Sequence, residues 1–154
     1  MTETITIPIS EYGYAAFSAS VPLNFGAVPD CEVYYLPHYS YAELRLKKVK
    51  GVAPAHFGVL IAVPKGVRQI TVPIATQEQA EQCGLTIYDN YFIATDEGGY
   101  LVPPGERNVC LGVKNGVPGL YYVAEGVTIP RGKWYLPKLP EMPLFKILFP
   151  TDSL

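Results

Sequence analysis

Polar and apolar residues alternate along much of this chain. In residues 4–7 and 41–49 the alternation places apolar side chains on one face of an extended segment, which predicts half-buried antiparallel strands. Residues 11–17 and 31–36 are rich in tyrosine and other strand-forming residues, and they predict two further strands. The first part of the chain is therefore expected to consist of short strands joined by turns.

The apolar run at residues 59–63 has no polar face. We therefore expect a central strand covered on both sides, and we expect residues 68–72 to pair back onto it as a hairpin partner. The second half of the chain returns to strand-like segments, and Asn115-Gly116 between two of them is a strong hairpin signal. These segments are residues 91–94, 100–102, 108–113 and 117–123.

A single helix is predicted between the two strand-rich parts. Thr76 is suited to the N-cap, Gln79 stands three residues later as in a capping box, and Gly84 is suited to end the helix. The sequence therefore predicts a helix of about two turns that connects the two halves.

A motif of glycine, proline and an apolar run occurs twice, at residues 51–64 and 126–137. Pro54 and Pro130, the first prolines of the two copies, stand 76 residues apart. Gly51 and Gly126 can take positive φ, while Gly58 and Gly132 would permit a tight corner before a buried strand. The motif is therefore interpreted as scaffold, a corner that leads the chain into the centre of a sheet.

These patterns predict an all-β fold with two similar antiparallel halves and one short helix near residues 76–83. The halves could pack as a β-sandwich or as paired small barrels. The expected organisation is a first β half, a helical connector, a second β half and a C-terminal tail that serves as an interface. Their bounds are residues 1–75, 76–84, 85–140 and 141–154, respectively.

Composition and charge exclude several classes of protein. A hydrophobic fraction of 49% excludes a disordered chain, and a net charge of −2 without a basic stripe gives no support for a nucleic-acid partner. The apolar run at 59–63 is far shorter than the ~20 residues that span a bilayer, so no membrane insertion is expected. Cys31, Cys83 and Cys110 are too scattered to predict a disulfide framework or a zinc site.

No catalytic signature occurs in the sequence. His56 lies at the corner of the first motif copy with no Ser, Cys or carboxylate at a recognisable spacing, and it is interpreted as a turn residue. The four aspartates, Asp96 among them, lie in or near predicted turns or a terminus, which turn chemistry explains better than a metal site. We therefore expect no enzymatic activity, no cofactor and no metal.

Aromatic and apolar residues are the candidates for binding. Exposed aromatic rings can anchor a protein interface or stack on a sugar, although core packing also accounts for many of them. An exposed strand as apolar as the tail would aggregate, so the tail should pair with the domain or with another chain. The candidates are Tyr34, Tyr39, Tyr41, Tyr122 and Trp134 in the body of the chain, and Leu144, Phe145, Ile147 and Phe149 in the tail.

The paired motif, preceded by Glu11-Tyr12-Gly13-Tyr14-Ala15, resembles a β-domain of Bacteroidetes surface proteins. The resemblance covers most of residues 10–138. It departs from the family pattern at His56, where an Asn is usual, and at Arg131-Gly132 in the second copy. Domains of this family accompany leucine-rich, carbohydrate-binding or adhesive modules, so the resemblance implies a non-catalytic domain.

The N-terminal residues lack the basic and apolar regions of a secretion signal, which favours a phage protein over a secreted one. Phages of the same bacteria, including the crAss-like group, carry host-like β-domains on their virions. The expected function is therefore a homo-oligomeric head-fibre or capsid-decoration protein at the virion surface. The alternative is a carbohydrate-binding or adhesive domain of a bacterial cell-surface or extracellular protein. The expected partners are other protein chains, with a glycan as a further possibility.

Overall fold

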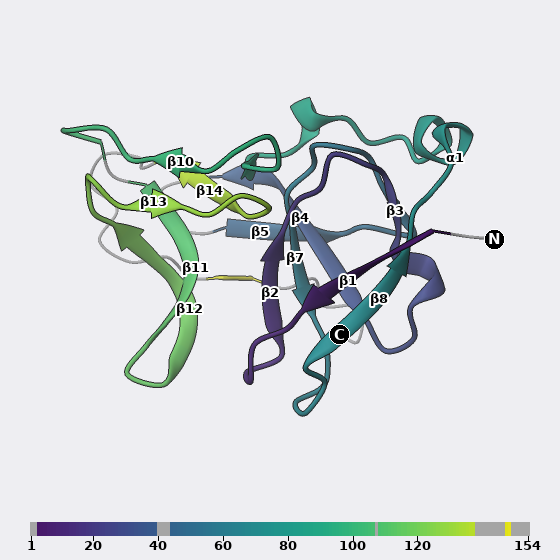
Figure 1. The fold of residues 1–154 in the computed structure, drawn as a ribbon, viewed down its shortest axis with the longest axis horizontal. Helices are drawn as coiled ribbons and strands as arrows, with labels where there is room; N and C mark the ends of the chain where they lie inside the picture. The colour runs from purple at the N-terminus through teal and green to yellow at the C-terminus, as the bar shows by residue number, and fades with distance from the viewer. Residues whose placement is uncertain (1–2, 40–43, 107, 138–146, 149–154) are drawn as a thin grey trace.

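A computed structural model describes residues 3–39, 44–106, 108–137 and 147–148 of the chain (Figure 1). The predicted all-β class is confirmed, because short strands in several antiparallel sheets dominate and only one short α-helix is present among these residues. No sheet among them closes on itself, so the architecture is sandwich-like. No described helix is long and apolar enough to cross a membrane.

Two sets of six strands follow one another along the chain. The first half contains β2 (Tyr14–Phe17), β3 (Leu23–Asn24), β4 (Glu32–Tyr39), β5 (Leu44–Lys48), β6 (Val52–Ala53) and β7 (Val59–Ala62). The second half contains β9 (Ile93–Ala94), β10 (Tyr100–Leu101), β11 (Asn108–Lys114), β12 (Val117–Val123), β13 (Thr128–Ile129) and β14 (Trp134–Pro137). The sheets run β5-β4-β7-β2 and β12-β11-β14-β9, and the small pairs are β3-β6 and β10-β13. The predicted similarity of the halves therefore holds strand for strand.

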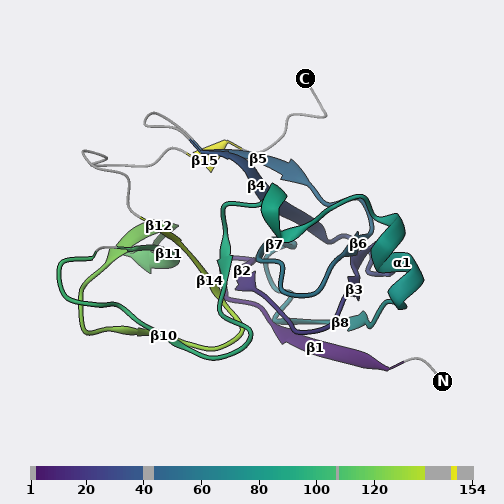
Figure 2. The same ribbon diagram turned by 90° about the horizontal axis from the view of Figure 1, so that it is seen from above.

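The first half carries extra elements that the second half lacks among the described residues. These are β1 (Thr4–Pro8), η1 (Phe25–Ala27), β8 (Gln69–Pro73) and the tail strand β15 (Ile147–Leu148). β15 pairs in parallel with β5 and extends the first sheet to five strands (Figure 2). The helix α1 (Gln77–Gln82) and η2 (Ile87–Asp89) connect the two halves.

The expected hairpin between residues 59–63 and 68–72 is wrong. β8 pairs with β1 along its whole length, from Thr4 opposite Pro73 to Pro8 opposite Gln69. β7 already has β2 on one side and β4 on the other, so neither of its edges is open to β8. β8 alternates between exposed and buried residues, and it pairs with β1, which is mostly exposed.

The local signals for the helix and the second hairpin are confirmed. The Thr76 hydroxyl accepts from the Gln79 N–H at 3.1 Å, and the Gln79 side chain accepts from the Thr76 N–H at 2.8 Å. Gly84 follows the helix with a φ of 77°. Between β11 and β12, Asn115 and Gly116 have φ values of 53° and 77°, as a two-residue hairpin turn requires.

The repeated corner is present in both halves, but its details differ from the expectation. Gly51 and Gly126 have positive φ values of 105° and 84°, as predicted. At the corner itself, however, the left-handed residue of the first copy is His56, with a φ of 61°, and its counterpart in the second copy is Gly132, at 84°. Gly58 is required for packing instead, because a Cβ there would lie 2.9 Å from the Cβ atoms of Phe92 and Trp134.

Two hydrophobic cores lie on opposite faces of the first sheet. The buried residues of the first core that the structure describes all come from the first half and its extra elements, and Val59 and Ile61 of β7 face it. The shared core joins both halves: Leu60 of β7 meets Trp134 and Leu136 of β14 there. Because these three β7 residues are all at most 2% exposed, the prediction of a central strand covered on both faces is confirmed.

Candidate functional site

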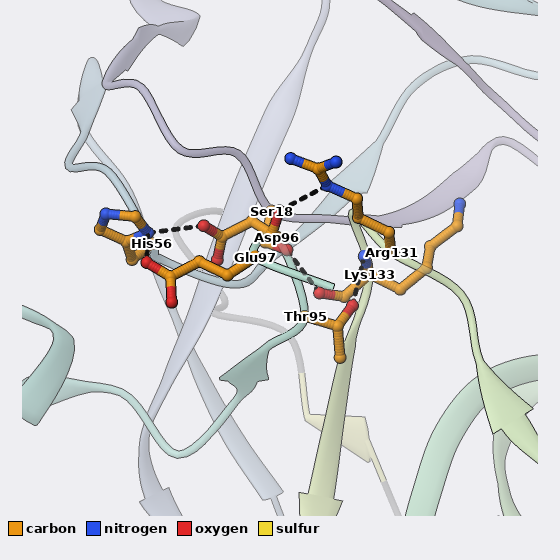
Figure 3. A network of polar contacts seen from close by, with 7 residues as sticks. All are labelled: Ser18, His56, Thr95, Asp96, Glu97, Arg131 and Lys133. Carbon is orange, nitrogen blue, oxygen red and sulfur yellow. Dashed lines mark hydrogen bonds and ion pairs between the residues drawn. The ribbon is translucent and has the colours of Figure 1, made fainter. Parts of the chain in front are cut away.

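Three ionisable side chains from the two halves converge at the first corner (Figure 3). His56 Nδ1 lies 2.5 Å from a carboxylate oxygen of Asp96 and 3.6 Å from one of Glu97. Asp96 and Glu97 belong to the turn that follows β9, about forty residues farther along the chain. This group, the corner cluster, is the candidate site that the fold assembles.

Hydrogen bonds from both corners hold the turn in place. Thr95 donates its hydroxyl hydrogen to the Pro130 carbonyl at 2.8 Å, and its hydroxyl oxygen accepts from the Lys133 N–H at 2.9 Å. The Arg131 Nε–H donates to the Asp96 carbonyl at 2.8 Å, which ties the second corner to the corner cluster (Figure 3). The two corners of the repeat and the intervening turn therefore form one connected polar network.

The two corners are anchored in equivalent ways. The N–H of His56 donates to the Ala19 carbonyl at 2.7 Å, just after β2. The N–H of Gly132 donates to the Thr95 carbonyl at 3.2 Å, just after β9. Ser18 links the halves directly, since its hydroxyl donates to the Lys133 carbonyl at 2.5 Å. The site thus lies where the duplicated units meet.

Burial differs sharply among the three members of the corner cluster. The Asp96 side chain is 4% exposed, that of His56 is 44% exposed and that of Glu97 is 81% exposed. A buried carboxylate is costly unless a hydrogen bond or an opposite charge compensates it, and the His56 imidazole supplies that contact. The pair therefore stabilises the junction between the halves.

An open groove of about 420 Å³ adjoins the corner cluster. Its polar rim includes His56, Asp96 and Glu97, and its apolar lining includes Ile87 and Ile93. The groove is wide enough for a ligand group to approach the exposed edge of the imidazole and the Glu97 carboxylate.

The corner cluster is the only group of the described residues that could hold a metal ion, with ligand atoms within 4.8 Å of one another. One imidazole nitrogen and two carboxylates would suit a first-row divalent cation. Two ligands that each lie about 2.0–2.2 Å from a tetrahedral metal are separated by more than the 2.5 Å between His56 and Asp96. In this arrangement the pair is hydrogen bonded directly, and a metal would require the imidazole to turn.

The same cluster lacks the parts of a nucleophilic site. Within the described ranges, the hydrogen-bond and ion-pair partners of the His56 imidazole are the two carboxylates, with no hydroxyl or thiol among them. A carboxylate that orients an imidazole is half of a catalytic triad, and the nucleophile is the missing half. The pair can accept or donate hydrogen bonds at the groove, and it holds the two corners together.

Two of the predicted interface residues lie in the interior, which corrects the expectation for them. Tyr34 is 2% exposed and Trp134 is 1% exposed, and both belong to the shared core. The alternation of β4 and β14 points these rings at the opposite sheet, where the Trp134 indole N–H donates to the Val59 carbonyl at 2.6 Å. Tyr122 is half-buried and packs against the shared core.

The other predicted interface residues have no described side chain. Tyr39 and Ile147 are placed by their backbones in β4 and β15. Tyr41, Leu144, Phe145 and Phe149 lie outside the described residues.

Sequence reasoning missed an exposed apolar group after the helix. Ile87 is 48% exposed, Tyr88 92%, Tyr91 49% and Ile93 40%. We call these four residues the connector patch. Ile87 and Ile93 both line the groove beside the corner cluster, so the patch and the cluster are neighbours. The sequence did contain a signal for this group: shortly after Gly84, which ends the helix, four large apolar residues occur within residues 87–93.

Replacement of His56 by valine is expected to lower the free energy of unfolding by at least about 1–2 kcal/mol, because a β-branched residue is strained at positive φ and because the buried Asp96 carboxylate loses its hydrogen-bond partner. His56→Asn is the matched control, since asparagine tolerates this conformation and can still donate a hydrogen bond to Asp96. Urea denaturation of the three proteins measures the difference. Equal stability of His56→Val and wild type would show that the left-handed corner is not a constraint.

Comparison of the chain with known protein families, with curated proteins and with solved structures gives no match.

Proposed function

We propose that this protein is a non-enzymatic structural and interaction protein that self-associates at a surface, as a head-fibre or capsid-decoration component of a virion. The resemblance to β-domains of surface proteins supports a surface role. The observation that carries the proposal is the connector patch, which presents apolar side chains to solvent at a groove with a polar rim.

The connector patch has the composition of a protein interface. Among the described residues, half of the eight exposed large hydrophobic side chains fall within these seven positions. Clustered exposed apolar residues with a polar rim mark association sites more often than scattered ones do, and tyrosine is enriched in such sites. The corner cluster supplies the polar rim through Glu97 and His56. A second copy of the chain is the occupant that we propose.

The corner cluster supports a non-enzymatic role. Its buried carboxylate is satisfied by His56, and the Arg131 side chain of the second corner donates to the Asp96 backbone carbonyl. An arrangement of this kind fixes the relative position of two structural units. The groove beside it is then available for recognition.

The experiment measures mass in solution by light scattering over a range of protein concentrations. Wild type is expected to form oligomers. The variant Ile87→Ser/Ile93→Ser is expected to be monomeric, because it removes the two isoleucine side chains of the connector patch that line the groove. The matched control is Leu101→Ser/Val127→Ser, which changes two side chains that are 61% and 47% exposed but lie outside the patch. This control should associate as wild type does.

Two results would overturn self-association through the patch: a wild type that stays monomeric at every concentration, or a patch variant that associates like wild type. A monomeric wild type that binds on a glycan array would favour the alternative, an adhesive domain of a cell surface. The specific observation behind that alternative is the exposed ring of Tyr88, which follows groove residue Ile87 in the chain, together with the groove carboxylate of Glu97. Loss of glycan binding in Tyr88→Ala would then identify the platform.

A further inference from the structure

A second cavity lies between the two halves, and its lining shares no residue with the connector patch. This cleft has a volume of about 400 Å³. One wall comes from β2 with the segment before it, and the other comes from β11 and from the chain around β13. Aliphatic and aromatic groups dominate both walls, with the edge of Trp134 among them. We call it the inter-half cleft.

Among the residues that the structure describes, one charged residue lines the inter-half cleft, and it is a cation. Lys133 is partly buried there, and no aspartate or glutamate is among the described lining residues. The backbone N–H and carbonyl of Lys133 are held by Thr95 and Ser18, so the start of its side chain is fixed. Its ammonium group makes no ion pair within the part of the chain that the structure describes. Figure 3 shows this group directed away from the corner cluster.

Partial burial of the charged Lys133 ammonium group costs free energy, and an anionic ligand could offset that cost. Burial lowers the pKa of Lys133, as expected for an ammonium group that loses water without gaining an anion. A charge in an apolar setting is stabilised by a charge-assisted hydrogen bond to an opposite charge. The hydroxyl of Ser10, which also lines the cleft, already donates to the Tyr14 carbonyl at 2.8 Å. None of the described residues supplies an anion to Lys133 in the cleft.

We propose that the inter-half cleft binds a small amphipathic carboxylate, such as a medium-chain fatty acid, with its carboxylate on the Lys133 ammonium group and its chain between β2 and β11. The apolar walls supply the affinity and the lysine supplies the orientation. A volume of about 400 Å³ is near the lower end for ligand cavities, which favours a short chain over a long one. Each methylene that enters the cleft should tighten binding about fourfold until the cleft is full.

The chain offers a direct readout, because Trp134 is its only tryptophan and lines the cleft. The test titrates decanoate into the protein and follows Trp134 fluorescence and the heat of binding. Octanoate and dodecanoate test the dependence on length. Decanol and decyltrimethylammonium have the same chain without a negative charge, and they separate binding to Lys133 from nonspecific apolar binding. We expect decanoate to bind about tenfold to a hundredfold more tightly than decanol.

The decisive variant is Lys133→Met, which keeps an unbranched side chain of similar length and removes its charge. It should bind decanoate and decanol equally, whereas the control Lys65→Met at an exposed turn should keep the wild-type preference. If Lys133→Met fails to fold, Val113→Glu replaces it, because an anion at this 47% exposed rim position should repel decanoate and leave decanol binding unchanged.

Three outcomes would overturn the proposal. The first is the absence of any decanoate binding to folded wild type. The second is an equal affinity of wild type for decanoate and for the cationic amphiphile. The third is an unchanged preference for decanoate in Lys133→Met or, where that variant is unfolded, in Val113→Glu. None of these outcomes depends on self-association, since the connector patch and the inter-half cleft share no lining residue.

Discussion

Replacement of Trp134 by alanine is expected to lower the free energy of unfolding by about 3–5 kcal/mol. The side chain is 1% exposed, and its ring stacks on Phe92 with the ring centroids 3.7 Å apart. Truncation leaves a cavity at the centre of the shared core. It also removes the indole N–H that donates to the buried Val59 carbonyl.

Urea denaturation followed by far-ultraviolet circular dichroism measures this loss. Trp134→Phe keeps a ring that can stack on Phe92 but loses the N–H donor and part of the indole volume, so it should retain more stability than the alanine variant and less than wild type. Tyr88→Ala is the control for loss of an aromatic side chain, since Tyr88 is 92% exposed and should change stability by less than about 0.5 kcal/mol. A loss under about 1 kcal/mol for Trp134→Ala would contradict the placement of this ring in a shared core.

Addition of a single methyl group at Gly58 is expected to cost about 1–3 kcal/mol. The new Cβ would lie 2.9 Å from the Cβ atoms of Phe92 and Trp134, closer than packed carbon atoms approach. Cβ atoms are fixed to the backbone, so relief requires the second half to shift away from the first. The cost is therefore steric and arises between the halves.

Gly98 provides the matched control for this substitution. A Cβ at Gly98 would meet no atom within 4 Å, and its φ is not in the left-handed region. Gly98→Ala is therefore expected to be neutral or slightly stabilising, because alanine restricts the unfolded chain. Chemical denaturation of both variants gives the comparison, and a Gly58→Ala protein as stable as Gly98→Ala would show that the halves are less closely packed than described.

Local signals in the sequence predicted local structure well. The capping box at Thr76, the turn at Asn115-Gly116 and the positive φ of Gly51 and Gly126 depend on a few neighbouring residues, and the structure contains all of them. The repeat was detectable in the sequence because each copy carries the glycine, proline and apolar residues of its own corner.

Strand pairings and side-chain contacts between residues far apart in the chain could not be predicted in this way. The pairing of β1 with β8 joins segments about sixty-five residues apart, and no local pattern distinguishes β8 as a partner of β1 from β8 as a partner of β7. The contact between His56 and Asp96 likewise spans the two halves, so it has no fixed sequence spacing. The burial of Tyr34 and Trp134 depends on which sheet face meets the other half, which alternation alone does not determine.

The two halves share a topology, but among the described residues only the first half has a hydrophobic core of its own. The first half has a core of its own, enclosed by β1, β8 and η1. The second half contributes Phe92, Val109, Trp134 and Leu136 only to a core that the first half completes. The second half therefore completes its packing only against the first, whereas the first half encloses a core without the second. Mutations in the second half are then tolerated only while its inner face continues to fit the first, whereas its outer surface is free to diverge toward new partners.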